Sequence, residues 1–491
     1  MKKITLFIAV FLVICFSAQS QQWSEVPGFN STYLIKRLQL FEEKLNILGS
    51  FPHPSYAPEE DIRYPGVVFN GEMLSFPYPE SRTAFASNAF ESVARFQGNC
   101  FMGGRLSRYP EIEWTPVVYS NNNGLVKMDS TGVHEVNGGV GATSTVYDLQ
   151  IFQDKLAVSG GFTFPVSNTA PADAPLSTGI VLWNGEDWEQ IGGVVNAGGV
   201  YELLTYDEKL WLFGSFSQVY TNSYITEDEI PQWVMEARNL AWWDGEQWGS
   251  TNGGANQRIL DAVVDTVNNI LYVCGEFSYM DYMPISRVAA WDGTNWYPVG
   301  SGLQGSAKSI EIYNGQLYVA GAALLPSNMW PNMSALIYFD GYNWQKVPGT
   351  EYTTGYFDEL CVYEDKLYAA GDFEMFNEAG FPTDISNQRL VSYYQHPDSV
   401  VWGVPASVDD ITAASPVHIY PNPVSDVLHI RAESMPHAQL KLLDSTGRVV
   451  IQESLNGTTH DLDVSALASG TYYISLYSRG SIMACERVVV E

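Results

Sequence analysis

The chain has 491 residues, of which 46% are apolar, 13% are aromatic and only 16% are charged. This composition excludes a long disordered chain and supplies enough apolar side chains for a sizeable core. The formal net charge of −30 argues against nucleic acids and anionic membranes as partners, because neither is attracted to an acidic surface.

The N-terminus has the pattern of a cleaved secretory signal. Lys2 and Lys3 precede an apolar run over residues 4–16, and small and polar residues follow at positions 17–20. We therefore predict a signal peptide over residues 1–20 and a secreted mature chain. The apolar run is too short to span a bilayer well and no other long apolar run follows, so we predict no membrane span.

The middle of the chain contains an internal repeat. Each unit begins with an apolar strand, a polar turn and a second strand that ends in glycine. Seven glycines mark the units at nearly even spacing: Gly49, Gly103, Gly160, Gly214, Gly275, Gly321 and Gly371. Repetition at a nearly fixed period indicates seven copies of one supersecondary unit.

A second motif predicts a tight turn later in each unit. It consists of an aromatic residue, Asp or Asn, Gly, two further residues and Trp, and it occurs at residues 183–188, 243–248, 291–296 and 339–344. Asp-Gly and Asn-Gly between apolar runs predict β-hairpins, because both residues tolerate positive φ. Each unit therefore contains four predicted antiparallel strands. Because radial closure of such units removes exposed sheet edges, we predict a seven-bladed β-propeller over residues 21–403.

The two ends of this region complement each other. Residues 22–28 look like the Trp-containing last strand of a unit, whereas the seventh unit lacks a clear one. We infer that the N-terminal strand completes the seventh blade. On these repeats, residues 22–405 resemble Kelch-like propellers of secreted bacterial proteins. The resemblance implies a fold and no particular activity, because propellers host many functions.

A linker and a second, small domain follow. Residues 404–415 are rich in Pro, Ala, Ser and Asp, which is typical of a linker. Residues 416–491 contain short strands separated by turn residues, so we predict a small Ig-like β-sandwich and an all-β fold throughout. Three motifs, Y-P-N-P-V-S-D, D-x-x-G-R and L-A-S-G-x-Y, contain its distinctive residues: Pro421, Asn422, Pro423, Gly447, Arg448 and Gly470.

These motifs, in this order and spacing, strongly resemble the type A C-terminal sorting domain of type IX secretion cargo. The resemblance implies that residues 416–491 bind the type IX secretion machinery after the chain has entered the periplasm. It also implies passage through the outer membrane and removal of this domain. We therefore expect a secreted or outer-membrane surface protein.

Sequence motifs for catalysis and for cofactors are missing. H-E-x-x-H and G-x-S-x-G do not occur, and a G-x-G-x-x-G that starts at Gly300 joins two predicted strands instead of opening a helix. We therefore expect no cofactor, and the sequence favours a protein without catalytic activity.

Long loops between the second and third strands of the units carry the candidate ligand-binding residues. Strand order places these loops on one face of the predicted ring, the long-loop face. Aromatic rings on variable loops suit a glycan or protein ligand, although the same rings could simply pin the loops down. The candidates are Tyr220, Tyr224, Trp233, Tyr279, Tyr282, Trp330 and Phe376.

A second candidate site lies in the first strand of each unit. If these strands line a central channel, their aligned positions form a ring at its mouth on the long-loop face. The aligned residues are Arg37, Ser92, Asp148, Glu202, Asp261, Ser309 and Glu359. The four carboxylates could bind Ca²⁺ or a cationic ligand, because hard cations take oxygen ligands. A solvated channel lining is the alternative, and a shift of one residue would turn these side chains elsewhere.

Three functions remain open at this point. The first is a binding or adhesion module for a glycan or a protein. The second is a glycan-acting hydrolase or lyase that uses channel-mouth carboxylates such as Asp148, Glu202 or Asp261. The third is a structural surface component. A deep acidic pocket would favour the enzyme, a shallow aromatic platform would favour binding, and a featureless channel would favour the structural component.

Overall fold

The computed structural model describes most of the predicted repeats and most of the C-terminal domain. The described residues are 22–26, 34–52, 62–69, 74–75, 85–86, 90–105, 124–129, 132–140, 144–164, 177–195, 198–221, 234–322, 324–325, 335–341, 343–350, 353–375, 389–395, 417–432, 438–443, 449–455, 457–478 and 481–490. The predicted signal peptide and linker lie outside them. Every regular element in the described residues is a β-strand, which confirms the all-β prediction. Across these ranges, no helix suited to crossing a membrane is found.

Seven antiparallel sheets, six with four strands and one with five, form most of the described repeat region. Sheet 1 contains, in order of pairing, β2 (Leu34–Phe41), β3 (Lys44–Pro52), β4 (Ile62–Phe69) and β5 (Leu74–Ser75), and β6 (Phe85–Ala86) also pairs with β4. Sheet 2 contains β7 (Phe90–Phe96), β8 (Asn99–Gly104), β9 (Leu125–Asp129) and β10 (Gly132–Glu135). Sheet 3 contains β11 (Thr145–Phe152), β12 (Lys155–Phe164), β13 (Ser177–Trp183) and β14 (Trp188–Glu189). Sheets 4 and 5 are β16 (Gly199–Tyr206), β17 (Lys209–Ser215), β20 (Leu240–Trp243) and β21 (Trp248–Gly249); and β22 (Ile259–Asp265), β23 (Ile270–Gly275), β24 (Val288–Trp291) and β25 (Trp296–Pro298). Sheets 6 and 7 are β26 (Ser306–Tyr313), β27 (Gln316–Ala322), β28 (Leu336–Phe339) and β29 (Trp344–Lys346); and β30 (Thr353–Tyr363), β31 (Lys366–Met375), β32 (Leu390–Tyr394) and β1 (Gln22–Glu25). Such sheets are consistent with propeller blades.

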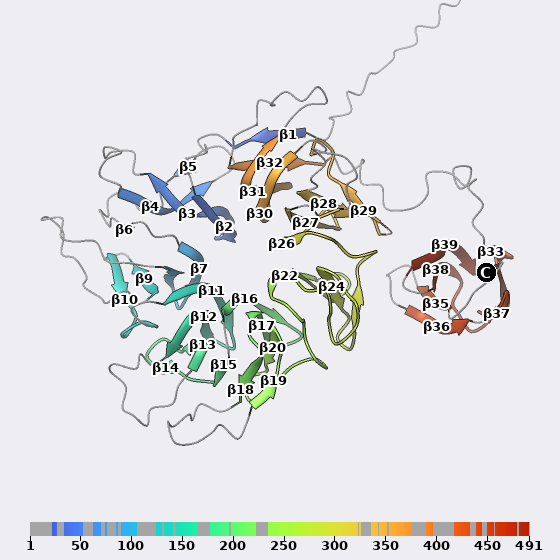
Figure 1. Ribbon diagram of the computed structural model, residues 1–491, viewed down its shortest axis with the longest axis horizontal. Helices are drawn as coiled ribbons and strands as arrows, with labels where there is room; N and C mark the ends of the chain where they lie inside the picture. Colours follow the sequence, from blue (N-terminus) through green and yellow to red (C-terminus); the bar gives the residue numbers. More distant parts are fainter. Residues whose placement is uncertain are drawn as a thin grey trace, which may run out of the picture.

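The sheets lie side by side around a common centre (Figure 1). The first strand of each sheet contacts the first strand of the next, from β2 and β7 through to β26 and β30. Contact between β30 and β2 joins the last sheet to the first. In sheet 7, β1 pairs antiparallel with β32, so that Gln22 lies opposite Tyr394 and Glu25 opposite Val391. The two ends of the repeat region therefore meet in one sheet.

Tryptophans of the outermost strands connect neighbouring sheets. Each indole N–H donates to the chain just beyond the outermost strand of the preceding sheet: Trp188 to the Asn137 carbonyl at 3.1 Å, Trp248 to the Ile191 carbonyl at 2.5 Å, Trp296 to the Thr251 hydroxyl at 3.3 Å, Trp344 to the Val299 carbonyl at 3.1 Å and Trp23 to the Pro348 carbonyl at 2.7 Å. Because Trp23 of β1 makes the same contact as its counterparts, β1 occupies the position of an outermost strand.

Asx turns explain why Asp-Gly or Asn-Gly recurs before these tryptophans. The Oδ1 atoms of Asn184, Asp244 and Asp292 each accept the N–H groups two and three residues further on, at 2.7 to 2.9 Å. The glycine that follows each of them has a φ between 93° and 109°, which favours glycine because it has no Cβ. The turn chemistry therefore fixes where each hairpin reverses.

The segment between β17 and β20 differs from the predicted irregular loop. Residues 217–238 contain β18 (Gln218–Tyr220) and β19 (Val234–Glu236), which form a three-stranded sheet with β15 (Gly193–Val195). Val219 and Val194 are fully buried in this small sheet. Strands of three residues are too short to show a periodic pattern, so they could not be predicted from hydrophobic periodicity.

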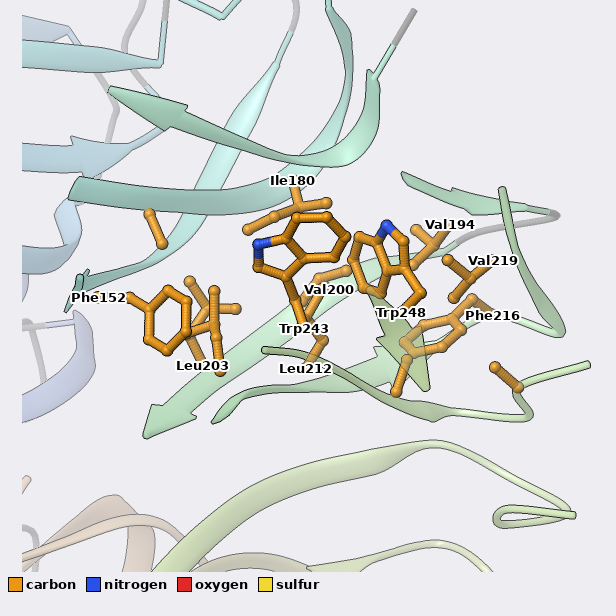
Figure 2. Close-up of a cluster of buried hydrophobic side chains, with 14 of the residues drawn as sticks. Phe152, Ile180, Val194, Val200, Leu203, Leu212, Phe216, Val219, Trp243 and Trp248 are labelled. Atoms are coloured by element: carbon orange, nitrogen blue, oxygen red, sulfur yellow. The ribbon is translucent and has the colours of Figure 1, made fainter. Parts of the chain in front are cut away.

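Apolar side chains fill the spaces between neighbouring sheets. Figure 2 shows the cluster between sheets 3 and 4, where Trp243 and Trp248 of sheet 4 lie close to Ile180 of sheet 3. Val200 and Leu203 of β16 belong to the same cluster. Burial of one such large side chain contributes about 1.5–3 kcal/mol. Packing between sheets therefore stabilises the ring and fixes the positions of its loops.

The C-terminal domain contains two further sheets. One consists of β33 (Val417–Tyr420), β34 (Val427–Ala432) and β37 (Thr459–Asp463), and the other of β36 (Val449–Leu455), β35 (Ala438–Leu443), β38 (Gly470–Ser478) and β39 (Ser481–Val490). Leu428 and Ile430 of the first sheet share one buried cluster with Leu440, Ile474 and Val488 of the second. This domain therefore has a hydrophobic core of its own.

Candidate functional site

A β-bulge occurs at the same place in the first strand of every sheet of the ring. Pairing with the second strand skips one residue there, and these bulge residues are Lys36, Glu91, Tyr147, Tyr201, Leu260, Lys308 and Asp358. The next residue in each strand is the ring residue expected from the sequence: Arg37, Ser92, Asp148, Glu202, Asp261, Ser309 or Glu359. A bulge re-aims side chains locally, so both residues can contribute to one site.

Two of the ring carboxylates accept hydrogen bonds from neighbouring sheets. Asp148 accepts the N–H of Leu149 at 2.8 Å and that of Leu203, in the next sheet, at 2.9 Å. It also accepts the hydroxyl of Ser92, in the preceding sheet, at 2.9 Å. Asp261 accepts the N–H of Ala262 in its own strand, and the hydroxyl of Ser309 and the N–H of Ile310 in the next sheet, at 2.7 to 2.9 Å. These two carboxylates therefore hold sheets together, which is a structural role.

Arg37 compensates the negative charge of the ring. Its guanidinium lies 2.6 Å from Glu202 Oε2 and 3.6 Å from Asp148 Oδ1. Burial alone would lower the pKa of Arg37, but the carboxylates of Asp148 and Glu202 together raise it, so Arg37 stays charged. Burial raises the pKa of Glu202 and of Glu359 well above the usual range, and Arg37 opposes both shifts. The ring therefore carries less net negative charge than its four carboxylates alone would give.

A cavity of about 200 Å³ lies at this ring. Its lining combines ring and bulge residues: Lys36, Arg37, Glu91, Tyr147, Tyr201, Glu202, Leu260, Asp261 and Glu359. The rings of Tyr147 and Tyr201 lie 5.4 Å apart in an edge-to-face arrangement. Burial raises the pKa of Glu91, with Lys36 and Arg37 opposing the shift. The bulge residues were not predicted as part of this site, because strict alternation along a strand would point their side chains away from the cavity. The available signal was the polar or aromatic residue that precedes most of the ring positions.

Arg37 occupies part of the ring that we expected to bind Ca²⁺ or a cationic ligand. Among the residues with described coordinates, no three His, Cys, Asp or Glu side chains come together to hold a metal ion. Arg37 takes the position between Asp148 and Glu202 that a cation would need.

Three of the seven aromatic candidates on the long loops lie in described residues. Tyr220 ends β18, where it pairs with Gly193 and Val234 and is half-buried, so it supports the loop's own sheet. Tyr279 and Tyr282 lie between β23 and β24 and are 49% and 64% exposed. The remaining candidates lie outside the described residues: Tyr224, Trp233, Trp330 and Phe376.

Tyr279 and Tyr282 border a shallow cavity of about 280 Å³, which we call the tyrosine platform. Its lining residues are Arg238, Gly253, Gly254, Asn256, Tyr279 and Tyr282. The Arg238 guanidinium lies 5.8 Å from the centre of the Tyr282 ring and pairs with Glu236 at 2.5 Å. Asn256 Oδ1 accepts the N–H of Tyr279 at 3.0 Å. The platform therefore combines two exposed aromatic rings with a guanidinium and an amide.

Asp281 fixes the loop that carries Tyr282. Its Oδ1 accepts the Thr251 hydroxyl and the Gly254 N–H, both at 2.7 Å, and its Oδ2 accepts the Asn252 N–H at 3.0 Å. The φ angles of Asp281 and Tyr282 are 47° and 65°, a region that bulky residues rarely adopt. Such a backbone persists only where surrounding contacts determine it. Tyr282 is therefore held on a fixed loop.

In the C-terminal domain, the Y-P-N-P-V motif contacts the last strand of the chain. Asn422 Oδ1 accepts the Val489 N–H at 2.9 Å, and the Val424 N–H donates to the Val489 carbonyl at 2.8 Å. Val424 also forms a parallel bridge with Val490. These contacts join residues that are 65 to 67 positions apart, so the motif and the terminal valines form one structural unit.

The other sorting-motif candidates lie around this unit. Pro421 and Pro423 each follow a cis peptide bond beside Asn422. Gly470 begins β38 opposite Val490. The remaining two candidates, Gly447 and Arg448, lie outside the described residues.

Comparison with known families identifies this C-terminal domain. Residues 418–491 match the secretion system C-terminal sorting domain, which confirms the predicted type IX sorting domain. Such a domain directs export through interaction with the type IX secretion machinery, so the protein is secreted and reaches the cell surface. No curated protein matches the chain.

Several solved structures share a distant likeness with the chain. PorZ, a surface component of the type-IX secretion system of Porphyromonas gingivalis, is 14% identical with a TM-score of 0.38, over 95% of this chain and 60% of that one. U3-55K is 10% identical with a TM-score of 0.39, over 77% of this chain and 99% of that one. The BT4673 extracellular domain from B. thetaiotaomicron is 10% identical with a TM-score of 0.22, over 94% and 74%. The chain thus spans 60% of the PorZ structure, and likenesses this distant support no argument about its function.

Proposed function

We propose that this protein is a secreted binding module whose ligand, a glycan or a protein, docks on the long-loop face of a seven-bladed, Kelch-like β-propeller. In this proposal residues 1–20 are a signal peptide, residues 21–403 form the propeller closed by β1, and residues 404–415 are a linker. Residues 416–491 are a β-sandwich that the export machinery recognises. Rigid scaffolds that carry variable loops commonly place binding residues on those loops.

The tyrosine platform is the observation that carries this proposal. Concave sites lined by aromatic rings and a few polar groups are the usual form of small-ligand sites. Here Tyr279 and Tyr282 supply the rings, and Arg238 and Asn256 supply the polar groups. Because Asp281 fixes the loop before any ligand arrives, little conformational entropy is lost on binding.

An array of extracellular polysaccharides and matrix proteins tests the proposal with the mature secreted protein. The wild type should bind at least one component, and Arg238→Ala should weaken that binding. Glu246→Ala, an exposed change in an Asx turn on the opposite face, should leave binding unchanged. A folded wild type that binds nothing would contradict the proposal and support the structural surface component.

A glycan-acting hydrolase is a second candidate, which the raised pKa of Glu359 at the channel mouth favours. A carboxylic acid kept protonated by burial can donate a proton to a glycosidic oxygen, with an ionised carboxylate as its partner. Unlike Asp148 and Asp261, Glu359 accepts no backbone hydrogen bond in the part of the chain that the structure describes.

Release of reducing ends from polysaccharides tests this second candidate. Turnover that Glu359→Gln abolishes and Glu364→Gln leaves intact would establish it, because Glu364 lies in the β30–β31 turn, away from the mouth. Without turnover on any polysaccharide, the carboxylates of the mouth have only a structural or binding role.

A further inference from the structure

The geometry points to a neutral sugar unit of an extracellular glycan as the ligand of the tyrosine platform. This inference rests on the proposed binding function and names the chemical class of its ligand. Four features of the platform support it: the exposed rings, the fixed position of Tyr282, the available donors with balanced charge, and the size of the cavity.

The tyrosine rings are exposed because other side chains anchor their loop. Phe277 and Met280 are fully buried and Ile285 is 1% exposed, whereas Tyr279 and Tyr282 are 49% and 64% exposed. The two tyrosine hydroxyls make no hydrogen bond within the described ranges. The apolar face of a pyranose ring packs well on an aromatic ring that also carries a polar tip. The tyrosines are therefore free to contact a sugar.

Gly253 makes room for the Tyr282 ring over the main chain. A Cβ at position 253 would lie 2.5 Å from Tyr282 Cε2, so a larger residue would displace the ring. Asp281 independently ties the Tyr282 loop to Asn252 and Gly254. Two separate contacts therefore hold the ring in place, as a preformed stacking surface requires.

Hydrogen-bond donors without excess charge surround the rings. Asn256 Nδ2 donates one hydrogen bond to Ser278 Oγ at 3.1 Å, which leaves the second N–H of the amide for a ligand hydroxyl. Arg238 offers further N–H donors, and its ion pair with Glu236 balances its charge. The net charge of −30 also repels polyanionic glycans. A neutral sugar fits this environment best.

The cavity is small enough to favour a sugar over a peptide. Its volume of about 280 Å³ lies at the lower limit of small-molecule sites, which run from about 300 to 1,000 Å³. One sugar unit can occupy it while the rest of the glycan extends into solvent. An extended or proline-rich peptide would need a longer groove with successive aromatic ridges.

Titration of the full-length mature protein tests the inference. The probes are neutral gluco-, manno-, galacto- and N-acetylglucosamine oligosaccharides, with polyuronates and proline-rich peptides in parallel. We expect one neutral series to bind, with roughly tenfold weaker affinity in Tyr279→Ala and in Tyr282→Ala because an aromatic contact is lost. Tyr282→Phe keeps the ring and should bind within about threefold of the wild type. Val267→Ala is the matched control, since Val267 is 90% exposed in the β22–β23 turn.

Each other outcome identifies which claim fails. Peptide binding that both alanine variants lose would overturn the sugar assignment and keep the binding function. Binding of polyuronates alone would overturn the neutral class. Sugar binding that survives in the Tyr279→Ala/Tyr282→Ala double variant would place the site elsewhere and overturn the inference. A folded protein that binds no probe would overturn the sugar assignment. If it also binds nothing on the array of polysaccharides and matrix proteins, the proposed binding function is wrong as well.

Discussion

At the scale of single residues, Arg37 is the one basic side chain at a repeat position that otherwise carries serine or a carboxylate. Asp148 and Glu202 are 3% and 8% exposed, and both lie within ion-pair distance of Arg37. Removing one partner of a buried ion pair leaves an uncompensated charge, which costs far more than the pair contributes net. Arg37 is therefore more important for folding than a surface arginine.

Arg37→Met should lower the free energy of unfolding by about 3–5 kcal/mol. Chemical denaturation measures this change. The control is Arg95→Ala, because Arg95 pairs with Glu42 at the surface, where such pairs contribute about 0–1 kcal/mol. Equal effects of the two substitutions would show that the ring carboxylates do not depend on Arg37.

Glu311 should make stability depend on pH. Burial raises the pKa of Glu311 from 4.5 to about 7 in the folded state. Between these values the folded state binds more protons than the unfolded state, so the free energy of unfolding falls as pH rises and levels off above about pH 7. Glu311→Gln should remove this slope and be more stable at pH 8, on the order of 2 kcal/mol.

Denaturation of both proteins from pH 4 to 8 provides the measurement for Glu311. Only the difference between the two curves is informative, because other carboxyls titrate in both proteins. Parallel curves would contradict the assigned shift.

At the scale of elements, β1 is the strand that joins the two ends of the repeat region. The ring centres of Trp23 and Tyr393 lie 4.9 Å apart, and the Trp23 indole N–H donates to the Pro348 carbonyl at 2.7 Å. A Cβ at Gly349 would lie 2.7 Å from the Trp23 ring, which shows how closely the two segments pack. Because β1 covers the edge of β32, the ring depends on residues close to the predicted signal cleavage site.

Trp23→Ala should destabilise the ring by on the order of 2–3 kcal/mol, since Trp23 is half-buried. Trp23→Phe keeps most of the packing and loses only the indole hydrogen bond, so its cost should be about 1 kcal/mol. Thermal and chemical unfolding of the mature protein give both values. An unchanged unfolding midpoint in Trp23→Ala would show that β1 does not close the sheet.

Strand and turn chemistry explains which elements were predictable. The hairpins could be predicted from the Asp-Gly turns and the recurring glycines, because both reflect local backbone requirements. The bulges were not predictable, since they depend on pairing with the second strand, and without them Tyr147 and Tyr201 could not be placed at the channel mouth. The contact between Arg37 and Glu202 spans 165 residues, so only the closed ring reveals it.

For the candidate site, the sequence could not show which aromatic side chains are exposed or which contacts anchor their loop. Aromatic loop residues were identifiable by type, and Tyr279 and Tyr282 were among them. Nothing in the pattern separated them from Tyr220, which supports a small sheet instead. The role of Asp281 depends on Thr251 and Gly254, which lie 30 and 27 residues earlier in the chain.

At the scale of the whole molecule, the chain combines a ring of sheets with a C-terminal sorting domain. The sorting domain has its own core and directs secretion. In the ring of sheets, the loop between β23 and β24 carries Tyr279 and Tyr282 of the tyrosine platform. We propose that the sorting domain brings the ring of sheets to the cell surface, where the tyrosine platform binds its ligand.

Adhesion of whole cells to immobilised glycan tests most directly whether the displayed platform binds its ligand. A bacterium with type IX secretion expresses the wild type, the Tyr279→Ala/Tyr282→Ala double variant or a chain without residues 418–491, and surface antibody labelling normalises display. We predict adhesion for the wild type, equal display with background adhesion for the double variant, and neither display nor adhesion for the truncated chain. Equal adhesion by the wild type and the double variant at equal display, or display without residues 418–491, would contradict the account.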